Sequence, residues 1–170
     1  DSPLRDAATR EIALRLLDAG ADPAEANQRL ILGFPTAEDR DSGDPKLLDA
    51  VSADDFVRGQ SRVFGTSNPQ RMDVPFWIAM IRAGVPAYDA QAKFKSAKPH
   101  EDEPIWCADR FGQSLTLLPD GRTIQIGGEH EDHYDPDFCI YNDVFVHQLD
   151  GSIEIYGYPE EVFPPTDFHT

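Results

Sequence analysis

The chain has 170 residues, of which 40% are hydrophobic, and this length suits one domain of ordinary size. Its 15 lysines and arginines against 31 aspartates and glutamates give a formal net charge of -16 at pH 7. This charge disfavours contact with phosphate backbones and anionic lipid, so we expect no nucleic acid partner and no membrane partner. Because no apolar run reaches membrane-spanning length and only 2 cysteines are present, we expect a cytoplasmic protein.

Helix signals fill the first part of the chain. Ser2 and Pro3 form a start signal, because a hydroxyl can cap a helix and proline is tolerated in its first turn. Apolar residues at four-residue steps then predict an amphipathic helix that ends at Gly20. A second start signal at Asp22 predicts another short helix, which runs to Ile31.

The segment from residue 2 to residue 22 resembles an ankyrin repeat. Ser2-Pro3-Leu4 stands where that family has Thr-Pro-Leu, and the residues from Glu11 to Asp22 match its second helix and closing turn. The family's histidine after Pro-Leu is Arg5 here, and no second copy follows. The resemblance implies a recognition module whose repeats stack against one another.

Polar and helical segments alternate in the middle of the chain. Residues 33–43 are predicted to form a loop, and short helices are predicted over residues 47–51 and 52–59. The most apolar helix is predicted over residues 76–81, with Gly84 after its end, and another amphipathic helix over residues 86–94. The large side chains of residues 76–81 are the predicted helical core: Phe76, Trp77, Met80 and Ile81.

A charged stretch with two prolines separates a predicted helical half, residues 1–98, from a strand half, residues 105–170. Tight-turn signals at Asp120-Gly121 and Asp150-Gly151 join neighbouring strands into an antiparallel meander with one covered face. We therefore expect an α+β fold in one compact unit, with the helical half packed against four or five strands. The strand signals cover residues 105–107, 114–118, 123–126, 143–147 and 152–156.

Residues 110–170 resemble one blade of a kelch-type β-propeller. Arg110-Phe111-Gly112-Gln113-Ser114 stands at the family's Arg-x-Gly-x-Ser strand, and Thr123 to Gly128 stands at its apolar run with a double glycine. The segment from Pro164 to Thr170 stands where the family enters its next blade. The tryptophan usual in the third strand is replaced by the neighbourhood of Ile155-Tyr156. Since propellers need roughly four to eight blades, the resemblance implies a module that recognises or assembles with other protein.

The loop that follows the double glycine concentrates histidines and carboxylates. Imidazole and carboxylate together suit zinc, manganese or iron, so a divalent metal is predicted on His130, His133, Asp135 and Asp137. The alternative is a structural loop whose carboxylates accept backbone N–H bonds or pair with nearby arginines, Arg110 and Arg122. The histidines are three residues apart and lack the helical His-Glu-x-x-His spacing, which favours the structural alternative.

The resemblances and the charge together favour a non-catalytic protein-binding or assembly module. A sheet that ends in Asp167, Phe168, His169 and Thr170 would leave an unpaired edge, so these residues are predicted to contact a protein partner or a second copy of the chain. No Gly-x-Ser-x-Gly or phosphate-binding motif points to catalysis. Two alternatives stay open: a metal-dependent enzyme that uses the acidic loop, and an acidic inhibitor or immunity-like protein of a basic target.

Overall fold

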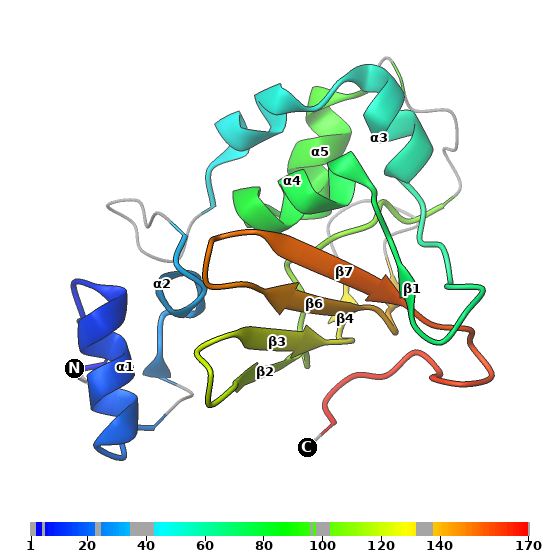
Figure 1. Ribbon diagram of the computed structural model, residues 1–170. Helices are drawn as coiled ribbons and strands as arrows, with labels where there is room; N and C mark the ends of the chain where they lie inside the picture. Colours follow the sequence, from blue (N-terminus) through cyan, green and yellow to red (C-terminus); the bar gives the residue numbers. More distant parts are fainter. Residues whose placement is uncertain are drawn as a thin grey trace. The chain divides into compact units, whose positions relative to one another are not determined.

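A computed structural model describes residues 3–4, 6–22, 25–34, 43–95, 97, 103–131 and 138–169 of the chain. Its helices and antiparallel sheet give an α+β fold, as predicted (Figure 1). Contacts divide the chain into two units, Asp1–Asp44 and Pro45–Thr170. The second unit therefore holds helices as well as the sheet. Whether the predicted halves, residues 1–98 and 105–170, act as folding units stays a prediction.

The first unit contains helices α1 (Arg10–Asp18) and α2 (Gln28–Ile31). α1 begins later than the predicted start near Pro3, because its N-cap is Thr9, whose hydroxyl accepts the backbone N–H of the third helical residue at 3.3 Å. Gly20 adopts a φ of 88° directly after the helix, so the predicted end is confirmed.

A small apolar cluster holds the first unit together. Leu4, Ala7, Ala13 and Ile31 are buried against one another. The guanidinium Nε of Arg10 donates to the backbone oxygen of Ile31 at 2.6 Å, which ties the start of α1 to the end of α2.

The second unit opens with helices that follow the sequence prediction closely. They are the 3₁₀-helix η2 (Pro45–Ala50) and the α-helices α3 (Ala53–Gly59), α4 (Pro75–Ala83) and α5 (Ala87–Lys93). Ser52 and Asp55 cap α3 reciprocally: the Ser52 hydroxyl accepts the Asp55 N–H at 3.1 Å, and the Asp55 carboxylate accepts the Ser52 N–H at 3.3 Å. Gly84 ends α4 in the left-handed conformation.

Replacing Ser52 with alanine is expected to lower the free energy of unfolding of the second unit by about 1 kcal/mol, because the first turn of α3 loses its side-chain acceptor. Urea titration monitored by tryptophan fluorescence measures this, since Trp77 and Trp106 both belong to the second unit. Ser52→Thr keeps the hydroxyl, so the free energy of unfolding should fall by only roughly a few tenths of a kcal/mol, because serine and threonine are both good N-cap residues. An equal loss in both variants would contradict the role assigned to the cap.

The main sheet has five antiparallel strands in the order β1-β7-β6-β3-β2 (Figure 1). β2, β3, β6 and β7 form the predicted meander, whereas β1 was not predicted and joins the sheet through Gln70, which pairs with Gly157. The bounds of the strands are β1 Gln70–Arg71, β2 Ser114–Leu117, β3 Thr123–Ile126, β6 Val144–His147 and β7 Ile153–Gly157.

The chain leaves the main sheet between β3 and β6 to form a separate strand pair, β4 (Glu129–His130) and β5 (Cys139–Ile140). The predicted strand over residues 105–107 is wrong, because this segment belongs to neither sheet. The backbone N–H of Trp106 in this segment donates instead to the backbone oxygen of Gln60 at 2.6 Å, next to the end of α3.

Aromatic side chains connect the helices to the sheet in the core of the second unit. Trp77 of α4 stacks on Trp106 with ring centroids 4.8 Å apart, and Trp106 in turn contacts Phe145 of β6 at 5.7 Å. On β3 the buried side chains are the polar Thr123 and Gln125, while Ile124 and Ile126, which alternate with them, are half-buried. The side chains of β3 therefore alternate in burial, with the polar residues on the more buried side.

Candidate functional site

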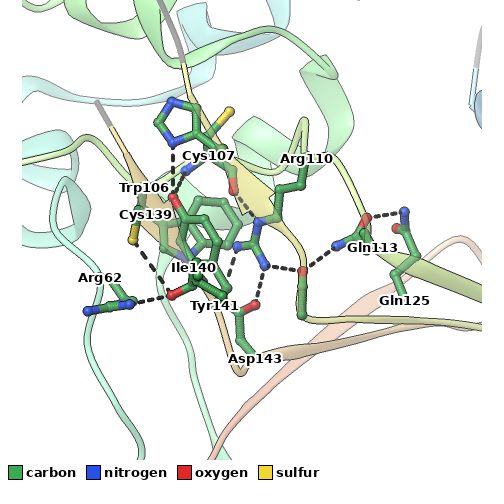
Figure 2. Close-up of polar contacts among 12 residues, drawn as sticks. Arg62, Trp106, Cys107, Arg110, Gln113, Gln125, Cys139, Ile140, Tyr141 and Asp143 are labelled. Atoms are coloured by element: carbon green, nitrogen blue, oxygen red, sulfur yellow. Dashed lines mark hydrogen bonds and ion pairs between the residues drawn. The ribbon is translucent and has the colours of Figure 1, made fainter. Parts of the chain in front are cut away.

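Arg110 is the central residue of a buried polar cluster in the second unit (Figure 2). Its guanidinium forms an ion pair with Asp143, and Nη2 donates to a carboxylate oxygen of that residue at 3.1 Å. Nε donates to the backbone oxygen of Cys107 at 2.6 Å. The Arg110 side chain is fully buried and that of Asp143 is 7% exposed, so the pair is shielded from solvent. Among the described residues, Asp143 is thus the ion-pair partner of Arg110.

Three aromatic rings enclose this ion pair. The guanidinium carbon of Arg110 lies 3.4 Å from the ring centroid of Tyr141, and 4.9 Å from those of Trp106 and Phe145. The indole N–H of Trp106 donates to Asp143 at 2.9 Å. The cluster therefore fixes the segment before β2 against the start of β6, which indicates a structural role.

A chain of side-chain amides continues from this cluster into the sheet (Figure 2). The backbone oxygen of Gly127 accepts from Arg110 at 3.0 Å and from Gln113 at 3.3 Å. Gln125 donates to Gln113 at 2.7 Å, and its own oxygen lies 2.8 Å from Nε2 of His147. Burial lowers the pKa of His147 from 6.5 to about 4, so this histidine is neutral at physiological pH. It is a packed histidine of the sheet.

Of the four predicted metal ligands, only His130 lies among the described residues; His133, Asp135 and Asp137 lie outside them. His130 is buried in β4 opposite Cys139, and its Nδ1 lies 3.4 Å from the Tyr141 hydroxyl. Within the described ranges, no group of three or more histidines, cysteines, aspartates or glutamates is placed to hold a metal ion. The divalent metal stays a prediction.

The predicted interaction residues lie in the C-terminal segment, whose backbone bonds to the rest of the second unit. Thr166 donates to Tyr141 at 2.9 Å and accepts from Gly128 at 2.8 Å, and Phe168 donates to Gly112 at 2.9 Å. Gly112 has a φ of 61°, and a Cβ there would lie 2.6 Å from the Phe168 nitrogen, so only glycine permits this approach. The backbone groups of Thr166 and Phe168 therefore form hydrogen bonds within the second unit, where an unpaired edge was expected.

The side chains of the predicted interaction residues have different surroundings. Phe168 is 69% exposed, and His169 lies with Nε2 3.1 Å from the Ser114 hydroxyl. A hydrogen bond to Asp167 raises the pKa of Glu129, because the shared proton is held between two carboxyl groups. Thr170 lies outside the described residues. A role of these residues in partner contact stays a prediction.

A surface cleft of about 570 Å³, which we call the Arg62 cleft, lies beside β5. Arg62, from the segment after α3, donates to the backbone oxygen of Ile140 (Figure 2). Its guanidinium carbon lies 4.6 Å from the ring centroid of Phe64. The cleft is lined by Ser61, Arg62, Glu103, Pro104, Phe138, Cys139, Ile140, Glu160 and Pro165. These residues come from four separate parts of the chain, so no local pattern in the sequence predicted the cleft.

The lining of the Arg62 cleft combines apolar and charged groups. The Phe138 side chain is 55% exposed although it is a large aromatic group. Cys139 is 7% exposed, and burial raises the pKa of its thiol, so it is protonated at neutral pH. A cleft of this volume can accept several side chains of a bound segment.

No helix in the described part of the chain has the length and apolar character needed to cross a membrane. Comparison of the chain with protein-family models, with curated proteins and with solved structures gives no match. The resemblances to an ankyrin repeat and to a kelch blade therefore stay predictions from the sequence.

Proposed function

We propose that the chain is a non-catalytic protein-binding module, and that a segment of its partner occupies the Arg62 cleft. The observation that carries this proposal is the exposed Phe138, which lies in a cleft of about 570 Å³ beside proline and charged side chains. An aromatic group in a recess with a polar rim is the arrangement that supplies most of the binding energy in protein interfaces.

The state of the reactive side chains also supports binding rather than catalysis. A nucleophilic cysteine requires a lowered pKa, whereas burial raises the pKa of the Cys139 thiol in the cleft. His147 is buried and hydrogen-bonded to Gln125, so it has no access to a reacting group at the surface.

We also propose a cytoplasmic location. The chain has only 2 cysteines, far fewer than the small secreted domains that depend on a disulfide framework.

A random peptide library displayed on phage is expected to yield sequences that bind the wild-type protein through the cleft. Phe138→Ala should weaken binding of the enriched peptides by about 10-fold, because truncation of a central aromatic residue typically costs more than 1 kcal/mol. Fluorescence anisotropy with synthetic copies of the peptides measures the affinity.

Phe111→Ala is the matched control, because Phe111 is 65% exposed and does not line the cleft. Its affinity for the same peptides should stay within about 2-fold of wild type, as expected for a side chain outside the interface. Peptides that bind all three proteins equally, or a library that yields no binder, would contradict the proposed function.

A further inference from the structure

Two carboxylates of the Arg62 cleft have no cationic partner within the described residues. Glu103 and Glu160 line the cleft and are exposed, and neither forms an ion pair there. The guanidinium of Arg62 is engaged by the backbone oxygen of Ile140 and by the ring of Phe64. Among the described residues, the two carboxylates therefore have no ion-pair partner, although the cation Arg62 lines the same cleft.

Several carboxylates elsewhere in the second unit form ion pairs with arginine. Asp55 pairs with Arg58, Asp120 with Arg122, Asp143 with Arg110, and Glu154 with Arg71. The chain as a whole carries a formal net charge of -16. A field of this sign concentrates cations near the surface and accelerates their association.

We propose that the partner segment in the Arg62 cleft carries at least one lysine or arginine, which contacts Glu103 and Glu160, next to an apolar residue that packs on Phe138. This inference rests on the proposed function, because it names the chemistry of the segment that the cleft binds. Glu103 and Glu160 give it selectivity for cationic sequences, and Phe138 gives it apolar contact area.

Three fluorescein-labelled pools of randomised decapeptides test the inference. Every third residue is fixed as lysine in one pool, as glutamine in the second and as glutamate in the third. Wild-type protein should bind the lysine pool about 5-fold more tightly than the glutamine pool, and the glutamate pool most weakly. The preference should fall as sodium chloride is raised from low to high concentration.

Two double variants separate the cleft from the overall charge. Glu103→Gln/Glu160→Gln should bind the lysine and glutamine pools with nearly equal affinity. Glu25→Gln/Glu161→Gln removes the same charge from exposed positions outside the cleft lining, and it should keep the wild-type preference.

The outcomes distinguish the two proposals. Equal binding of the three pools to wild type, with a loss of binding in Phe138→Ala, would overturn the inference and leave the proposed function intact. A lysine preference that both double variants reduce equally would also overturn it, since the overall charge would then explain the effect. No binding of any pool would overturn both proposals.

Discussion

Replacing Arg110 with methionine is expected to lower the free energy of unfolding of the second unit by about 3–5 kcal/mol. The variant leaves Asp143 buried, with 7% of its side chain exposed and without its cationic partner. The remaining hydrogen bond from the Trp106 indole does not neutralise that charge. The rings of Trp106, Tyr141 and Phe145 exclude the water that could solvate it. Urea titration with tryptophan fluorescence measures the loss.

A matched exposed pair provides the control. Arg122→Met breaks the pair with Asp120, whose side chain is 53% exposed, and should cost no more than about 1 kcal/mol. The double variant Arg110→Met/Asp143→Asn should be more stable than Arg110→Met alone, because no charge is then left buried. A loss that Arg110→Met shares with Arg122→Met would show that the buried pair contributes little.

Elements that depend on neighbouring residues could be predicted from the sequence. The capping box of Ser52 and the left-handed Gly84 each act within one turn of the helix they bound, so α3 and α4 lie where predicted. The turns at Gly121 and Gly151 likewise join strands that pair as the predicted meander.

Features that depend on distant residues could not be predicted in this way. Residues 105–107 have the composition of a strand, but Trp106 bonds to Gln60 and stacks on Trp77 instead. Arg110 and Asp143 are 33 positions apart in the sequence, and no local pattern connects them. The Arg62 cleft joins four segments for the same reason, so neither its carboxylates nor Phe138 could be recognised as a site.

The second unit is expected to lose about 3 kcal/mol of stability through His147 as the pH falls from 6.5 to 4. Burial lowers the pKa of His147 from 6.5 to about 4 in the folded protein, whereas the unfolded chain keeps the ordinary value. Between these two pH values the unfolded state binds a proton that the folded state does not. The free energy of unfolding therefore decreases with falling pH over this range, and the contribution is constant above and below it.

His147→Gln removes the titrating group and keeps an N–H donor for the Gln125 oxygen, which lies 2.8 Å from the imidazole Nε2. Urea titrations at several pH values between 4 and 7 should therefore show a smaller dependence of stability on pH in the variant. Carboxyl groups with shifted pKa values titrate in both proteins; examples are Glu129, whose pKa is raised, and Glu154, whose pKa is lowered. Their contributions therefore cancel when the pH dependence of the variant is subtracted from that of the wild type. Equal slopes in the two proteins would mean that His147 accepts a proton as readily when folded as when unfolded.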